Sequence, residues 1–464
     1  MKKSILFIFA LSLLETLLLY HCTLGINALL MNILMIVFLF FYLKNNNLIK
    51  NKKGLLLLIP ISILSITYFI YNNVFNILNI FVIPLLYILM LIFVVSPKRQ
   101  IEDLLVSIVN TIIRPFDFID SYLKESKKLV TNNKIVSQEQ KRIMKSIIIV
   151  LPIVIIVLFL LSSADQMFLD LFHFLPNPFE NITLGSIIGR VIMTASFFIY
   201  VGSSFLYLKK EFSKEKDVIK KIKIDEYTIQ ILLTILNGIY IIFDIIQVRS
   251  LWMHRLSSGI NYAEYARSGF FQLMFISLIN LIIILLSKKS RESNYSKWMS
   301  LIMILLTSII IGSSFFRMFL YEQAYGYTVL RLGVYIILFT EVILLIPTII
   351  YIFNSKLNIL KYYIIIITSI YTIVNCVSID QIIAANNIKR YERTGKIDLY
   401  YLENNNTDNL KQLINFYNHC ENEKEKELLD TYFSKMKEKL QKQDIREYNL
   451  SKARAKKILK EKRN

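Results

Sequence analysis

Five charged residues interrupt long apolar runs of this chain, and charged side chains in such places can bind ligands, form ion pairs or conduct ions. They are Glu15, Arg190, Asp244, Arg317 and Glu341. A charge costs free energy in a hydrocarbon environment, so each one requires a structural or functional reason. A charge near a helix end can reach the interface, and opposite charges can form purely structural bridges. Arg190 and Glu341 lie deepest in their runs, which favours a buried pair or a substrate site.

The apolar runs indicate an integral membrane protein. Hydrophobic residues make up 55% of the 464 positions, and the mean hydropathy is +0.50. Runs such as 146–163 and 334–353 are long enough to cross a hydrocarbon core, where only helices satisfy every backbone group without open edges. The sequence predicts an all-α fold: a polytopic transmembrane helix bundle with about 11 spans and a C-terminal soluble helical tail. The expected spans are 4–20, 23–43, 54–71, 74–95, 146–163, 183–208, 228–247, 270–287, 299–321, 334–353 and 362–379.

The charges of the connecting loops predict the orientation of these spans. With the N-terminus in the cytoplasm, Lys and Arg gather in even-numbered loops such as 44–53, 209–223 and 288–297, whereas loops 21–22 and 72–73 contain none. Loops rich in Lys and Arg stay on the cytoplasmic side. The abundance of Ile, Lys and Asn is typical of an AT-rich bacterial genome. We therefore expect a multi-pass protein of a bacterial cell membrane whose C-terminal tail is extracytoplasmic.

Four regions follow from this pattern. N-terminal transmembrane helices occupy 1–95, a cytoplasmic basic amphipathic segment 96–145, core transmembrane helices with outer loops 146–379, and a charged helical tail 380–464. Apolar residues recur at helical spacing over 101–123, which predicts an interfacial helix. The mixed charges of the tail are spaced as on the solvated face of a helix.

The possible partners follow from the charges and the metal-binding residue types. The net charge of +20 arises in loops and tail, and no aromatic-basic module for nucleic acid is visible. The basic end of the tail, 452–463, is suited to contact anionic lipid or a wall polymer, with a solvated helix as the alternative. Cys22, Cys376 and Cys420 form no CxxC pair, and the four histidines match no ligand spacing. We expect no metal and no cofactor, and protein partners stay open.

Four segments together resemble a known family. The sequence reads LLSSADQMF at 160–168, NYAEYARSGFFQL at 261–273, RMFLYEQAYGYTVLRLGVY at 317–335 and QIIAANNIKRYERTGKIDLYYL at 381–402. In this order they are similar to motifs of a bacterial family of multi-pass membrane proteins, a domain of unknown function with the signature YAEYARxGFF. Ala385 stands where that family has arginine, so no role for that arginine carries over.

The resemblance marks residues without assigning an activity to them. The matching positions are Asp165, Tyr262, Glu264, Tyr265, Arg267, Arg317, Tyr321, Tyr325, Gly326, Thr328, Arg331, Asn387, Arg390, Asp398 and Tyr401. On the expected topology they lie at the outer face or just below it, as do the five intramembrane charges. We therefore expect one outward-facing polar site that includes Arg190, Asp244, Arg317 and Glu341 together with the marked residues of the outer loops.

Three classes of function fit such a site. The first is a ligand-binding, partner-binding or signalling membrane protein, and the second is a transporter or lipid-handling protein. The third, an enzyme at the outer leaflet, is disfavoured because no HExxH, GxSxG or cofactor motif is present. The charges lie on one side only and no inverted repeat is evident, which argues against alternating access. The one-sided arrangement favours the first class.

Overall fold

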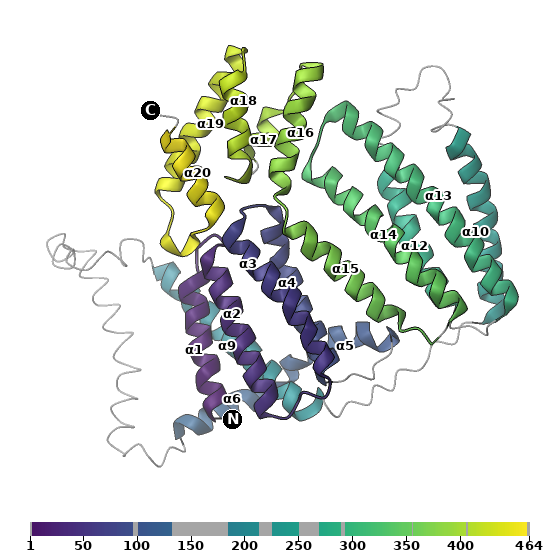
Figure 1. Ribbon diagram of the computed structural model, residues 1–464. Helices are drawn as coiled ribbons and strands as arrows, with labels where there is room; N and C mark the ends of the chain where they lie inside the picture. Colours follow the sequence, from purple (N-terminus) through teal and green to yellow (C-terminus); the bar gives the residue numbers. More distant parts are fainter. Residues whose placement is uncertain are drawn as a thin grey trace.

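The computed structural model of the protein describes residues 2–95, 101–131, 184–212, 225–249, 269–288, 293–354, 356–404 and 407–461 (Figure 1). Every element in these ranges is a helix or a helical turn. They form two apolar bundles, two helices at one face of these bundles, and a compact tail at the opposite face. We call the latter the tail-side face.

The first bundle, here called the N-terminal bundle, joins the start of the chain to a later helix. Its members are α1 (Lys2–Leu19), α2 (Ile26–Asn45), the turn η1 (Lys52–Leu57), α3 (Leu58–Ile70), α4 (Val74–Val95) and α9 (Leu184–Tyr207). Leu43, Ile61, Ile92 and Tyr207 are fully buried in its core. The outward faces of these helices expose large apolar side chains, as expected where lipid is the solvent.

The second bundle, the C-terminal bundle, contains most of the expected intramembrane charges. It consists of α10 (Glu226–Gln247), α12 (Phe270–Ser287), α13 (Asn294–Tyr325) and α14 (Val329–Phe353). Leu233, Ile284, Met303 and Leu338 are fully buried between these helices. Another long helix, α15 (Ile359–Asn375), lies between the two bundles in Figure 1 and packs against both cores.

Two helices lie at the face opposite the tail, where α2 and α4 end. The segment predicted as one interfacial helix forms α5 (Ile101–Ile113), a turn that contains Pro115, and the start of α6 (Ile119–Thr131). Proline cannot donate a backbone hydrogen bond, and its ring opposes a continuous helix. The apolar side chains of Val109, Ile113 and Phe116 are exposed here.

The tail folds into a compact helical unit, as expected for its helical sequence pattern. It comprises α16 (Ile379–Thr394), α17 (Leu399–Asn404), the turn η5 (Thr407–Asn409), α18 (Leu410–His419), α19 (Glu423–Gln441), the turn η6 (Ile445–Glu447) and α20 (Leu450–Glu461). Ile383, Leu402, Leu413 and Leu429 are fully buried in a core of its own. Phe75, from the start of α4, joins this core and ties the tail to the N-terminal bundle.

The described helices confirm an all-α, multi-pass membrane architecture. Eight of them are long and apolar enough to cross a membrane, or nine if α15 and α16, bent by 64°, form one span. The apolar helix α1 is shorter than these. The expected span at 146–163 lies outside the described residues. The tail lies on the same face as the turns at 71–73 and 326–328 (Figure 1).

Candidate functional site

Five members of the expected polar site lie outside the described residues. They are Asp165, Tyr262, Glu264, Tyr265 and Arg267. The other members are distributed over three places: the interior of the C-terminal bundle, the contact of the tail with the α13–α14 turn, and the N-terminal bundle. Each place has a different hydrogen-bonding character.

Arg317 lies buried between α10 and α13 of the C-terminal bundle, with only 5% of its surface exposed. Its Nη2 donates a hydrogen bond to Oε1 of Gln247 at 3.0 Å. Gly269, which precedes α12 with φ of +92°, lies beside this guanidinium, and a Cβ there would stand 3.1 Å from Arg317 Nη1. The glycine of the GFF motif thus permits both the left-handed turn and the close approach of the arginine.

Asp244 lies one turn before Gln247 on α10 and is 4% exposed. Neither carboxyl oxygen has a hydrogen-bond partner among the described residues. The side chain borders a groove of about 560 Å³ between α10 and α13. The groove is lined by Ile241, Asp244, Ile245, Val248, Arg249, Leu306 and Ile309. An acid therefore lies at the edge of an apolar groove, with Arg249 as the one basic lining residue.

Glu341 lies deeper in the same bundle and is 1% exposed. Ser277 of α12 donates a hydrogen bond to its Oε2 at 2.5 Å, whereas its Oε1 has no partner within the described part of the chain. One turn further along α12, Asn280 accepts from Tyr240 at 2.8 Å and donates to Thr307 at 3.0 Å. These contacts link all four helices of the bundle through polar groups at mid-helix.

Gln247, Ser277 and Asn280 were missed as site residues by the sequence analysis, which considered only charged groups within spans. A usable signal was present. Gln247 follows Asp244 by three positions and Asn280 follows Ser277 by three, so each pair shares one helix face. Uncharged polar groups at such spacing in an apolar helix are typical of helix–helix contacts in membranes.

Arg190 lies apart from these groups, in the N-terminal bundle. Its guanidinium lies 5.0 Å from the ring centre of Tyr20, near the end of α1. One turn along α9, Thr194 and Thr16 share a hydrogen bond of 2.7 Å. A cation over an aromatic ring is favourable, so Arg190 has a local partner in the packing of α1 against α9.

The turn between α13 and α14 gathers several residues marked by the family motifs. Tyr321 packs against Tyr325 with ring centres 5.1 Å apart, and the guanidinium of Arg331 lies 4.2 Å from the Tyr321 ring centre. Arg331 donates to the carbonyl oxygen of Gly326, whose φ is +82°. Thr328 caps α14 by accepting from the Arg331 backbone. The AYGYT motif is therefore a capped, ordered turn.

The tail holds this turn through side chains of α16 and α17. Asn387 forms two hydrogen bonds with the backbone of Tyr327: Oδ1 accepts from its N–H at 2.9 Å and Nδ2 donates to its carbonyl at 2.8 Å. The hydroxyl of Tyr401 accepts from the backbone N–H of Val329 at 2.7 Å. Asp398 caps α17 by accepting from the Tyr401 backbone. The start of α14 and the residue before its cap are thus held by side chains 60 to 72 positions away.

Arg390 completes the same contact at the end of α13. Its Nη2 donates to the carbonyl of Ala324 at 2.6 Å and its Nε to that of Gln323 at 3.2 Å, while Nη1 reaches the carbonyl of Lys396 at 3.1 Å. The last carbonyls of a helix lack intrahelical partners, and a cation also suits the negative end of the helix dipole. We call Asn387, Arg390 and Tyr401, with the backbone of 323–329, the tail clasp.

A second contact joins the tail to the turn between α3 and α4. Asp408, which is 5% exposed, accepts from the backbone N–H of Asn72 at 3.1 and 3.3 Å. Burial raises the pKa of Asp408 above its ordinary value, an effect opposed by hydrogen bonds from Ser451 and Asn72 and by the nearby charge of Arg454. The net direction is upward, so the docked tail favours the protonated acid.

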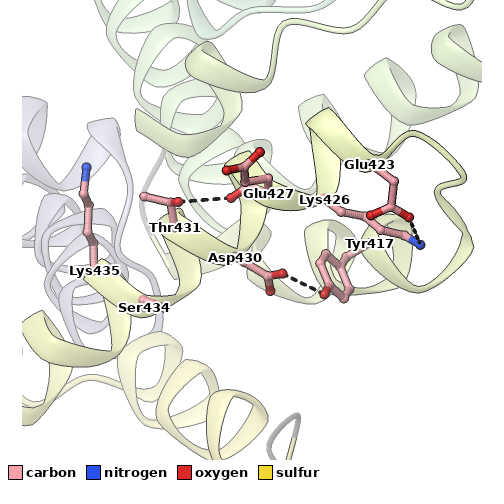
Figure 2. A pocket seen from close by; sticks show the side chains of 8 residues that line it. All are labelled: Tyr417, Glu423, Lys426, Glu427, Asp430, Thr431, Ser434 and Lys435. Atoms are coloured by element: carbon pink, nitrogen blue, oxygen red, sulfur yellow. Dashed lines mark hydrogen bonds and ion pairs between the residues drawn. The ribbon is translucent and has the colours of Figure 1, made fainter.

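The outer surface of the tail has a groove of about 680 Å³ along α18 and α19 (Figure 2). Part of its charged lining is internally paired: Tyr417 donates to Asp430 at 2.9 Å, and Lys426 lies 3.6 Å from Glu423. Such pairing is typical of a solvated helix face. No cluster of three or more metal-ligating side chains occurs among the described residues.

Long apolar helices, polar contacts buried between them and a tail docked on one face define a multi-pass integral membrane protein. The family model for a domain of unknown function, DUF4153, matches residues 58–416, and the chain belongs to this family. The family expected from the four motifs is confirmed, and the match begins earlier in the chain, at α3. No curated protein and no solved structure matches the chain.

Proposed function

We propose that this chain is a ligand-binding membrane protein of the receptor or scaffold type, with its site between the middle of the C-terminal bundle and the tail-side face. Arg317, Asp244 and Glu341 would form the polar part of that site. The proposal rests on the incomplete hydrogen bonding of the two acids. Both oxygens of Asp244 and one of Glu341 lack a partner in the described part of the chain.

The energetic argument concerns the cost of leaving such groups buried. A buried polar atom without a partner costs roughly 1–3 kcal/mol, and more if it is charged. Replacing such a group by an apolar residue of similar size would remove that cost. Its presence is understandable if the carboxyl groups receive hydrogen bonds or charge from a bound molecule. We therefore expect a ligand with a hydrogen-bond donor or a cationic group, because either can pair with a carboxyl oxygen.

The site is expected to face outward. The turns 71–73 and 326–328 on the tail-side face lack Lys and Arg, whereas the ends of α2 and α9 at the opposite face are followed by the basic segments 44–53 and 209–212. This contrast predicts that the opposite face is cytoplasmic. Cysteines introduced at Tyr325 and at Tyr400, both exposed, test this in cells with an impermeant thiol reagent, in a chain whose cysteines at 22, 376 and 420 are replaced by serine. Labelling of intact cells is expected. Labelling only after permeabilisation would show that the tail-side face is cytoplasmic and would contradict the expected orientation.

The binding function can be tested by native mass spectrometry of the full chain purified in mild detergent. We expect an adduct of constant mass that is lost from the Asp244→Asn and Glu341→Gln variants. The matched control is Asp120→Asn, since Asp120 is an exposed acid on α6. Adducts of equal abundance in all four proteins would contradict the proposal.

One observation favours a second candidate, a lipid-handling protein. The groove beside Asp244 is lined mainly by apolar side chains, with Ile241 and Ile245 exposed towards the lipid side of α10. A lipid could place its chain along this groove and a polar head near Arg249. A phospholipid mass for the adduct would support this candidate, and a water-soluble compound would support a receptor.

A further inference from the structure

The segment 446–449, which contains the end of η6 and precedes α20, is fixed to the ends of three helices of the N-terminal bundle. Arg446 donates to the carbonyl of Leu17 in α1 at 2.6 Å. The backbone N–H of Ile26, at the start of α2, donates to the carbonyl of Tyr448 at 2.8 Å. Asn449 donates to the carbonyl of Tyr71, just after α3, at 3.2 Å. Residues 445–449 therefore lie at the tail-side ends of the N-terminal bundle (Figure 1). We infer that the membrane interface is at this level, because these helix ends mark the edge of the apolar bundle.

An apolar side chain projects from this turn and is covered very little by the described residues. Ile445 is 86% exposed, the largest exposed fraction among the exposed hydrophobic residues of the described chain. Three residues later in the same segment, Tyr448 packs beside Phe69 of α3 with ring centres 5.9 Å apart and keeps 41% of its surface exposed. Large apolar and tyrosine side chains at this depth are typical of residues that enter the headgroup region.

Three lysines line the adjacent face of α20. Together with η6 they border a groove of about 490 Å³. Its lining residues are Gln443, Asp444, Ile445, Tyr448, Ala453, Lys456, Lys457 and Lys460. The one acid in the groove, Asp444, is engaged by Arg446, whose Nε and Nη2 donate to it at 2.6–3.1 Å. The lysine charges are therefore not neutralised by that acid.

The remaining charges nearby leave the groove positive. Lys457 lies 3.9 Å from Glu461, and both are largely exposed, so that pair is weak. Neither Lys456 nor Lys460 forms an ion pair within the described residues. Lys452, from the same basic run, is 8% exposed and donates to Thr23 at 2.7 Å, so it has a docking role instead.

We propose that this groove binds the headgroup of an anionic phospholipid of the surrounding membrane. Lys456, Lys457 and Lys460 would contact the phosphate, while Ile445 enters the acyl boundary below it. The sequence alone left lipid and wall polymer open as partners of the basic tail. The interfacial depth and the exposed isoleucine favour lipid, because a soluble polymer has no apolar region in which this side chain could be buried.

The lysines can be tested by measuring which lipid the full-length protein retains. The protein is exchanged into mixed micelles with equal amounts of phosphatidylglycerol and phosphatidylcholine, and retained lipids are counted by native mass spectrometry. We expect phosphatidylglycerol to be preferred, and the preference to fall about tenfold in the variant Lys456→Gln/Lys457→Gln/Lys460→Gln. The control, Lys389→Gln/Lys411→Gln/Lys424→Gln, makes the same charge change at exposed tail positions outside the groove. Equal loss in both variants would overturn the site.

The apolar contact has a separate test. In a chain whose cysteines at 22, 376 and 420 are replaced by serine, Ile445→Cys is labelled with bimane and reconstituted in phosphatidylglycerol vesicles. Brominated acyl chains are expected to quench this label, and not a label at the exposed tail residue Lys424. Absence of quenching at 445 would overturn the proposal. So would displacement of retained phosphatidylglycerol by soluble polyglycerol phosphate at equal phosphate concentration, since that result assigns the groove to a polymer.

Discussion

The tail clasp and the interior of the C-terminal bundle both contain polar side chains with little exposure, but the two regions differ in how completely these side chains are hydrogen-bonded. In the clasp, Asn387 and Arg390 form hydrogen bonds with backbone atoms of the α13–α14 turn. In the bundle, Asp244 and Glu341 keep oxygens without partners among the described residues. Satisfied groups stabilise the architecture, whereas unsatisfied ones reduce stability and need another reason to be present. Under the proposed function, this difference gives the clasp a role in folding and the bundle acids a role in binding.

The largest effect is expected from Arg390→Ala. This change removes three charge-assisted hydrogen bonds to carbonyl groups, two of them at the end of α13. A loss of about 3 kcal/mol is expected, because bonds to charged groups contribute roughly 1.5–3 kcal/mol each and water replaces some of them. The tail should become sensitive to limited proteolysis at 37 °C. Lys389→Ala, at the exposed neighbouring position, is the control, and equal resistance of both variants would contradict the role of the clasp.

A smaller loss is expected from Gly326→Ala within the clasped turn. The residue has φ of +82°, and a Cβ would stand 2.4 Å from Asn387 Oδ1. Strain of this kind costs of order 1–3 kcal/mol. The melting temperature should fall, whereas Gly333→Ala, in the interior of α14 with nothing within 4 Å, should leave it unchanged or raise it. A fall of the same size in both variants would contradict a specific requirement for glycine at position 326.

A weaker effect concerns pH and the second contact of the tail. The raised pKa of Asp408 means that the folded protein holds this proton more tightly than the unfolded chain. As pH rises from the ordinary value of 3.8 through the raised one, the acid ionises in its buried position and docking weakens. Proteolytic release of the tail should therefore be slower at pH 4.5 than at pH 7. Asp408→Asn should reduce this difference, and an unchanged pH dependence would contradict the assignment.

The sequence could predict the helices and the buried charges, but not how the polar groups pair. Apolar runs of span length identify membrane helices because hydrocarbon admits little else, and most expected spans correspond to described helices. The family motifs marked Asn387, Arg390 and Tyr401 without a role. Their role depends on backbone groups about 60 to 70 positions away, and only the bend between α15 and α16 brings these together.

The sequence also could not predict which of the charged residues lie close together in the fold. Arg190 and Glu341 are both deep within apolar runs of the sequence, which favoured a buried pair or a substrate site for these charges. The structure has Arg190 beside Tyr20 in one bundle and Glu341 beside Ser277 in the other. Which helices become neighbours depends on packing over the whole chain, and spacing along a single helix contains no such information.

The most direct test of the contrast between clasp and bundle is a matched pair of substitutions, Asp244→Leu and Asn387→Leu, compared by thermal unfolding in the same detergent. Both exchange a buried polar side chain for an apolar one of similar size. Asn387→Leu removes two backbone hydrogen bonds and should cost about 2 kcal/mol. Asp244→Leu removes an acid without described partners and should leave the melting temperature unchanged or raise it. A fall for Asp244→Leu as large as that for Asn387→Leu would make the acid a structural residue and contradict the proposed site.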